Sequence, residues 1–162
     1  SYPSLNQAVS VIQKGKVIQR MVLELQRYII ELGKEGVLLK NRLKEVISDL
    51  DREIDLVIKD YTLTQVKKTR ENLEELSYDE LLEKENILKS LSYEKPAVRL
   101  PLKGWRILSK TSLSDAEIAA MVAEADSLVD ILQAPEDFLK KVLGEEKTRT
   151  FKIELNRVKS VF

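Results

Sequence analysis

The chain has 162 residues, of which 43% are apolar and 33% charged, and its 27 basic and 27 acidic residues give a formal net charge of zero. This composition is that of a globular protein, and the zero net charge excludes a global field that would draw the chain to nucleic acid or to an anionic membrane. The chain contains neither His nor Cys. We therefore expect no disulfide, no His-based catalysis, no catalytic residues, no metal and no cofactor.

The residue content predicts an all-α protein, because 5 Gly and 4 Pro are few for a fold with many turns, and Leu, Lys and Glu favour helices. No apolar run approaches the roughly 20 residues that cross a bilayer, and the N-terminus lacks a signal pattern. We therefore expect a cytoplasmic protein without membrane contact. The chain starts at Ser1 rather than Met, which leaves open a processed terminus or a missing upstream domain.

The spacing of apolar residues predicts a first helix over 5–32, where they recur at three, four or six positions along one face. Ser4 is its predicted N-cap, since a Ser hydroxyl can accept a hydrogen bond from the first turn. Gly33 and Gly36 are predicted to end this helix and to turn the chain, because glycine tolerates positive φ angles.

A second helix is predicted over 37–62, and the sequence leaves open whether it is broken near Ser48. A weaker third segment begins at Thr64. A Ser-x-x-Glu capping box at Ser77 then predicts a fourth helix over about 78–91, since the hydroxyl and the carboxylate each satisfy a backbone N–H group. Its apolar residues are expected to close a bundle with the first two helices. These residues are Leu81, Leu82, Ile87, Leu88 and Leu91.

Pro96 and Pro101 mark the predicted domain boundary, because proline disfavours a helix at its own position and at the one before it. We therefore divide the chain into a first domain, 1–95, and a compact second domain, 96–162. Four short helices are predicted in the second domain. They are 105–110, 114–125 behind a capping box at Ser114, 135–142 with Pro135 at its first position, and 145–162.

Charge is unevenly distributed in the second domain. Residues 99–111 carry four bases and no acid, residues 112–137 carry seven acids and no base, and residues 138–162 carry seven bases and three acids. The two basic stretches can form one basic face that suits phosphates. Alternatively, the charges lie on solvated helix faces and pair with each other. The sequence does not decide between these two interpretations.

The segment 142–145, Val-Leu-Gly-Glu, lies between two predicted helices. A tight turn that leads into a helix presents backbone N–H groups and the positive end of the helix dipole to an anion. A helix-hairpin-helix holds a DNA phosphate in this way without reading base sequence. Taken alone, however, a single Gly such as Gly144 is more often a plain helix C-cap.

Two further motifs suggest binding sites but have simpler explanations. Asp49, Asp51, Glu53 and Asp55 offer four carboxylates, yet alternate spacing scatters them around a helix, so a solvated helix face is favoured over a cation site. Trp105 can stack on a base, but the single Trp of a small helical domain is expected in the core.

Three segments, in the same order, resemble the DisA family, whose members are diadenylate cyclases that scan DNA. Residues 27–36, Arg-Tyr-Ile-Ile-Glu-Leu-Gly-Lys-Glu-Gly, are similar to a tyrosine-initiated Glu-Leu-Gly-x-x-Gly segment of the family. Residues 103–111 resemble the start of its C-terminal domain, and residues 138–149 resemble its hairpin and the following basic helix. The resemblance implies a helical bundle or spacer domain followed by a small helix-hairpin-helix domain like the second domain of RuvA.

The resemblance also implies what this chain lacks. The catalytic motifs of the family are Asp-Gly-Ala and Arg-His-Arg, and neither occurs here. We therefore expect that this chain is not an enzyme. The parent protein is expected to make cyclic di-AMP with an N-terminal cyclase domain and to form a homo-oligomer.

The function implied by the resemblance is that of a non-catalytic DNA-binding or scaffold region that contacts the DNA backbone, including branched junctions. Val142 stands where the family has the first Gly of a Gly-hydrophobic-Gly hairpin, and a β-branched residue resists positive φ, so an altered hairpin is expected. The alternative is a structural or protein-interaction module with a degenerate hairpin that does not bind DNA. The implied DNA-binding residues are Leu143, Gly144, Glu145, Glu146, Lys147, Arg149 and Lys152.

Overall fold

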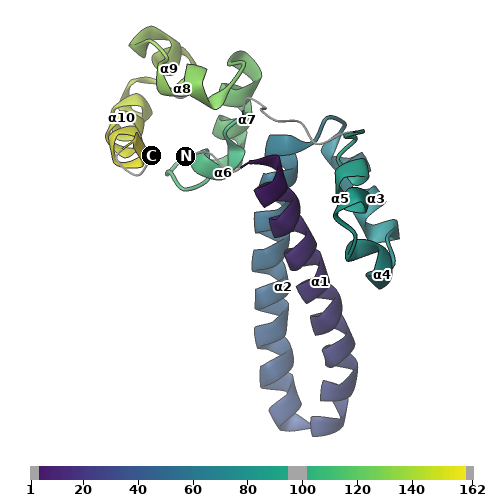
Figure 1. Ribbon diagram of the computed structural model, residues 1–162. Helices are drawn as coiled ribbons and strands as arrows, with labels where there is room; N and C mark the ends of the chain where they lie inside the picture. Colours follow the sequence, from purple (N-terminus) through teal and green to yellow (C-terminus); the bar gives the residue numbers. More distant parts are fainter. Residues whose placement is uncertain (1–3, 95–101, 160–162) are drawn as a thin grey trace. The chain divides into compact units, whose positions relative to one another are not determined.

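A computed structural model describes residues 4–94 and 102–159, and every regular element in these two ranges is a helix (Figure 1). The all-α prediction is thereby confirmed. The described residues divide into two compact units, 4–94 and 102–159. Within them, no helix combines the length and the apolar character needed to cross a membrane.

The helices of each unit follow one another closely along the chain. The first unit contains α1 (Leu5–Ile29), the 3₁₀ helix η1 (Ile30–Leu32), α2 (Lys34–Tyr61), α3 (Val66–Glu75), α4 (Tyr78–Leu81) and α5 (Lys84–Ser90). The second unit contains α6 (Trp105–Leu108), α7 (Asp115–Glu124), α8 (Leu128–Leu132), α9 (Glu136–Leu143) and α10 (Glu145–Lys159).

Helix α1 begins with the predicted cap. The Ser4 hydroxyl accepts a hydrogen bond from the Gln7 N–H at 3.3 Å, and the Gln7 side chain accepts one from the Ser4 N–H at 2.8 Å. Two N–H groups that have no partner inside the helix are satisfied in this way. The assignment of Ser4 as N-cap is confirmed.

The turn between α1 and α2 uses its two glycines differently. Gly33 adopts φ 65°, as predicted, and is the N-cap of α2. Gly36 was predicted to turn the chain as well, and this prediction is wrong, because Gly36 lies inside the first turn of α2. A Cβ at Gly36 would stand 2.4 Å from the carbonyl oxygen of Ile29. Because Gly36 has no side chain, the start of α2 can lie in close contact with the end of α1.

Helix α2 is a single helix without a break near Ser48, which settles what the apolar spacing left open. It runs back along α1, and the two helices approach closely at Gly15, where an added Cβ would lie 2.7 Å from Cδ1 of Ile54. The core of the first unit forms near this close approach of α1 and α2. Burial of each Leu or Ile side chain there stabilises the fold by about 1.5–3 kcal/mol. Its fully buried side chains include Ile12, Val57, Ile58, Leu73, Leu81, Ile87 and Leu91.

The predicted fourth helix over 78–91 is two helices, α4 and α5, so this prediction is wrong in its extent. Its start at the Ser77 capping box is confirmed. The chain leaves the helical conformation at Glu83, with φ −96° and ψ 112°, and the Asn86 side chain donates a hydrogen bond to the carbonyl of Glu80 at 2.9 Å. A side-chain amide thus replaces a helical backbone donor. Leu82, expected in the bundle, is exposed at this break.

Helix α5 ends in a Schellman motif. The N–H of Tyr93 donates to the carbonyl of Leu88 at 3.0 Å, and the N–H of Ser92 donates to the carbonyl of Lys89 at 2.9 Å. Ser92 takes φ 70° at the position where glycine is usual. Tyr93 is buried and its hydroxyl donates to the backbone carbonyl of Tyr61, and this burial raises the pKa of Tyr93 to about 12.

The second unit has one helix more than predicted. Capping at Ser114 is confirmed, and Pro135 is the N-cap of α9 rather than its first residue. The missed helix is α8, where the Ser127 hydroxyl accepts a hydrogen bond from the N–H of Asp130 at 3.3 Å. Five short helices close around one core. Its fully buried side chains include Leu108, Ile118, Met121, Leu128, Ile131 and Phe151.

Candidate nucleic-acid interface

Helices α9 and α10 are joined by a single residue, Gly144. Its N–H donates to the carbonyl of Lys140 at 2.9 Å. Its carbonyl accepts from the N–H of Thr148 at 3.1 Å and from the Thr148 hydroxyl at 2.5 Å. The backbone groups on both sides of the turn are therefore held by hydrogen bonds, so the start of α10 has a defined direction.

The backbone conformation of this turn requires glycine, whereas the space around the residue would admit a side chain. Gly144 adopts φ 83° and ψ 168°, a combination that is essentially restricted to glycine. An added Cβ would meet no atom within 4 Å. The predicted turn with Gly144 at its centre is thus present.

Val142 does not distort the turn. It lies in the last turn of α9, and Ser92 is the one residue other than Gly with positive φ in the described ranges. The expected strain at Val142 is therefore absent, because this position is helical and needs no glycine. Leu143, the next residue, is buried and anchors the end of α9 in the core.

The N-terminus of α10 carries N–H groups that attract an anion and carboxylates that repel it. The first N–H groups of a helix have no intrahelical acceptor, and the helix dipole adds partial positive charge there. Glu145 and Glu146, both exposed, occupy the first turn. Their carboxylates stabilise the helix end but place negative charge beside the N–H groups that were predicted to hold phosphate.

Two of the predicted cations are paired with acids of the second unit. Nζ of Lys147 lies 2.8 Å from a carboxylate oxygen of Glu117, and Nζ of Lys152 lies 3.2 Å from one of Glu136. The Lys147 hydrogen bond, followed by one from the Ser114 backbone, lowers the pKa of Glu117. Likewise, the Lys152 hydrogen bond lowers the pKa of Glu136. These pairs correspond to the alternative interpretation of the charge pattern.

The predicted cations also lie on different sides of α10. At about 100° per residue, Lys147 and Lys152 are roughly 140° apart around the helix, whereas Arg149 is about 60° from Lys152. Lys140 contacts Glu136 and Glu145 at 3.8 and 3.7 Å. Within the described ranges, no ion pair involves Arg149 or Lys141, and both side chains are exposed. The basic surface available beside the turn therefore consists mainly of these two residues.

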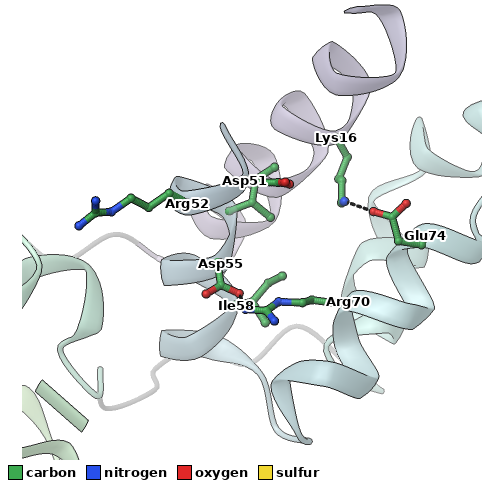
Figure 2. Close-up of a pocket in the computed structure, with 8 residues that line it drawn as sticks. Lys16, Asp51, Arg52, Asp55, Ile58, Arg70 and Glu74 are labelled. Atoms are coloured by element: carbon green, nitrogen blue, oxygen red, sulfur yellow. Dashed lines mark hydrogen bonds and ion pairs between the residues drawn. The ribbon is translucent and has the colours of Figure 1, made fainter. Parts of the chain in front are cut away.

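A second candidate site is a polar hollow of about 460 Å³ in the first unit (Figure 2). Its charged lining comprises three bases and three acids, which are Lys16, Arg52, Arg70, Asp51, Asp55 and Glu74. Figure 2 shows Lys16 paired with Glu74, and Arg70 pairs with Asp55. The charges of the hollow are thus balanced, and most are already paired. Sequence reasoning missed this hollow because three helices contribute to it.

The remaining sequence-based expectations have mixed outcomes. The alternating acids of α2 do not act together, because Asp51 accepts a hydrogen bond from Gln19 at 2.6 Å whereas Asp55 contacts Lys59 at 3.3 Å. Among described residues, no group of His, Cys, Asp or Glu side chains is arranged to hold a metal. Trp105, expected in the core, is half-buried at the start of α6.

Fold and surface together define a helical protein of two units, the second of which presents a glycine-linked helix pair. The family model of the DisA bacterial checkpoint controller linker region matches residues 2–99. This chain belongs to that family, and the resemblance found in the sequence is confirmed.

Relatives extend the similarity to the second unit. The DNA integrity scanning protein DisA of Fusobacterium nucleatum is 31% identical over 158 residues, which are 93% of this chain and 45% of the relative. Those of Clostridium acetobutylicum and Acetivibrio thermocellus are 31% and 32% identical, over 96% of this chain and 46% of each relative. The chain therefore spans about half the length of the relatives it matches.

Proposed function

We propose that this chain is the non-catalytic, DNA-contacting scaffold region of a DisA-type protein. In this proposal, residues 1–95 form a helical spacer and residues 96–162 form a helix-hairpin-helix domain. The observation that carries it is the one-residue turn at Gly144, which presents the start of a 15-residue helix. Such a turn suits a backbone phosphate and reads no base sequence.

The cations beside the turn extend the proposed contact. Lys141 and Arg149 bind phosphates first, because neither side chain forms an ion pair with an acid of the described ranges. Lys147 and Lys152 contribute once DNA phosphates displace Glu117 and Glu136. Branched DNA, which offers phosphates from more than one duplex, is the proposed preferred shape.

For the whole protein, we propose a cytoplasmic diadenylate cyclase whose N-terminal domain makes cyclic di-AMP and whose DNA-bound tail restrains that activity. Deleting this region from the whole protein should then abolish inhibition of the cyclase by junction DNA. Unchanged inhibition after the deletion would contradict the proposed restraint.

The competing function is a scaffold that does not bind DNA. It is favoured by Glu145 and Glu146 at the α10 N-terminus and by the pairing of Lys147 and Lys152 with acids. This function predicts that DNA affinity is absent even at low salt and that charge reversal beside Gly144 has no effect.

Fluorescence anisotropy of a labelled four-way junction and a matched linear duplex, from about 50 to 200 mM salt, separates the two functions. DNA binding predicts an affinity that falls with salt, with a log–log slope of roughly −0.9 per phosphate neutralised. Lys141→Glu and Arg149→Glu should each weaken binding. Lys67→Glu, the same charge change on an exposed residue of α3, is the matched control and should not. Absence of binding at the lowest salt would establish the scaffold function instead.

A further inference from the structure

The polar hollow of the first unit extends along the hairpin of α1 and α2. Its main part, of about 460 Å³, adjoins a smaller hollow of about 130 Å³. Lys16, Asp51 and Glu74 line both hollows, so they stand where the two meet, and we call the combined space the groove. Sites for small molecules in proteins have volumes of roughly 300–1,000 Å³. The groove is therefore large enough for one small ligand.

The groove combines apolar and charged side chains from three helices. Ile54 and Ile58 of α2 line its larger part and are buried, at 3% and 1% exposure. The charged residues come from α1, α2 and α3, and Figure 2 shows Lys16 reaching from α1 toward Glu74 of α3. Buried apolar residues with a few polar groups from different elements are the usual composition of a small-molecule site.

Lys16 supplies a buried cation with hydrogen-bond donors to spare. Its side chain is nine-tenths buried, whereas that of its counter-ion, Glu74, is 67% exposed. An ammonium group has three N–H donors, and of the described residues only Glu74 accepts a hydrogen bond from it. Burial of an ammonium with unmatched donors is costly. Two donors of Lys16 are therefore available to an anionic group that enters the groove.

A second cation, Arg70, lines the same hollow from α3. Its guanidinium pairs with Asp55, and this carboxylate also lies 3.3 Å from Nζ of Lys59. One acid is thus shared by two bases, and a guanidinium has five N–H donors, so Arg70 retains donors for another acceptor. Arg52 points away from these groups and takes no part (Figure 2).

Asp51 supplies the opposite charge at the junction of the two hollows. Its carboxylate accepts a hydrogen bond from the neutral amide of Gln19 at 2.6 Å, and it forms no ion pair within the described ranges. A carboxylate has about four acceptor sites, so most of those of Asp51 are available. The groove therefore offers free donors on Lys16 and free acceptors on Asp51, side by side in the lining of both hollows.

We propose that the groove binds a small zwitterion, a free amino acid or a short peptide. The ligand carboxylate accepts hydrogen bonds from Lys16 and Arg70, and the ligand ammonium donates to Asp51. A simple anion, such as a phosphate, meets the carboxylates of Asp51 and Glu74 without a positive group of its own, and like charges so close repel. This inference does not depend on DNA binding, so its failure leaves the proposed function untouched.

Isothermal titration calorimetry of the chain with chosen zwitterions and their blocked analogues tests the ligand class. The ligands are L-alanine, L-leucine, L-glutamate, L-lysine and the dipeptide Ala-Ala, each up to about 10 mM, which detects Kd values in the millimolar region and below. We expect saturable binding of at least one ligand. Its N-acetyl analogue, which lacks the ammonium, and its amide, which lacks the carboxylate, should each bind at least tenfold more weakly.

The same titrations distinguish the sources of the ligand. Tighter binding of Ala-Ala than of any free amino acid would indicate a peptide, and the reverse order would indicate an amino acid. Inorganic phosphate is titrated alongside and should bind more weakly than the zwitterion. No saturable binding of any zwitterion, or equal binding of the blocked analogues, would overturn the proposal.

Substitution of Asp51 locates the site without a risk to the fold, because Asp51 is exposed. Asp51→Asn keeps the shape and the bond to Gln19 but removes the charge, and it should weaken binding of the zwitterion at least tenfold. Asp49→Asn is the matched control, since Asp49 is an exposed acid of the same helix outside the groove. Equal affinity of the two variants would place the ligand elsewhere.

Lys16→Met tests the carboxylate end of the ligand, with Lys14→Met, an exposed lysine of α1, as its control. Lys16→Met should abolish binding and Lys14→Met should not. Because Lys16 is buried, far-UV circular dichroism checks that each variant is folded, and Asp51→Asn decides if Lys16→Met is not. Backbone-amide NMR of the unaltered chain adds an independent map. Shifts on titration should centre on Lys16, Asp51 and Arg70, and shifts confined to the second unit would overturn the assignment.

Discussion

Nζ of Lys147 lies 2.8 Å from Oε2 of Glu117, so the first turn of α10 is joined to the first turn of α7. Glu117 is also the acid of the Ser114 capping box. One carboxylate therefore caps a helix and neutralises a lysine that was predicted to bind phosphate. In the proposed contact with DNA, the affinity of the second unit depends on how readily such pairs open.

Glu117→Gln should tighten DNA binding, by roughly two- to tenfold near 100 mM salt, because it frees Lys147 for one more phosphate. Glutamine can still serve in a capping box, so α7 should persist. The log–log salt slope should become steeper by about 0.9. Glu80→Gln, at the equivalent capping position of α4, is the control without a lysine partner. Unchanged affinity in Glu117→Gln would mean that Lys147 does not reach the DNA.

Gly144→Ala should destabilise the second unit by about 1–3 kcal/mol, because alanine resists the backbone conformation at this turn. DNA affinity should fall because the start of α10 changes direction. Gly33→Ala is a matched control, since Gly33 also has positive φ and open space around it but lies in the first unit. Thermal unfolding and anisotropy are measured on both variants. Equal DNA affinity in the two variants would exclude the turn from the interface.

Ser92→Gly should stabilise the protein by about 0.5–1 kcal/mol, because Ser92 holds φ 70° in the Schellman motif and glycine accepts this angle without a Cβ penalty. The midpoint of urea unfolding should rise at constant slope. Ser92→Ala, which keeps the Cβ and removes the hydroxyl, should give no gain. A gain in both variants would trace the effect to the hydroxyl instead.

Tyr93 should make stability fall at high pH. Its pKa is raised from 10.0 to about 12 in the folded state, so the folded protein holds this proton more tightly than the unfolded chain. This contribution is complete below pH 10 and is lost as the pH rises from 10 through 12. Tyr93→Phe should flatten that decline and cost about 1 kcal/mol at pH 7, since the hydrogen bond to Tyr61 is lost. Chemical unfolding between pH 7 and 12 measures both effects. An unchanged decline in Tyr93→Phe would assign it to other groups.

The sequence-based predictions are correct where the deciding interactions join residues close together in the sequence. The caps at Ser4, Ser77 and Ser114 are correct because each depends on hydrogen bonds within four residues. The break between α4 and α5 was missed because apolar spacing is almost unchanged across it, while the deciding bond comes from the Asn86 side chain. Helix α8 was missed although the Ser127 cap is a local signal.

The candidate site divides in the same way. The turn at Gly144 was predictable, because a lone glycine between two apolar-striped helices is a local pattern. That Lys147 and Lys152 turn to opposite sides of α10 follows from helical geometry, but their partners do not. Glu117 is 30 residues from Lys147 in the sequence, and only the packing of α7 against the other helices brings it near.

The sequence by itself determined that the chain is helical, that it has no His or Cys for catalysis, and where most helices begin, since these properties arise from composition and from contacts a few residues apart. The tertiary structure alone decided which cations are already neutralised and which apolar stripe of α1 stays uncovered. Both depend on how helices distant in sequence pack, because an ion pair or a buried face needs two surfaces whose spacing no local pattern encodes.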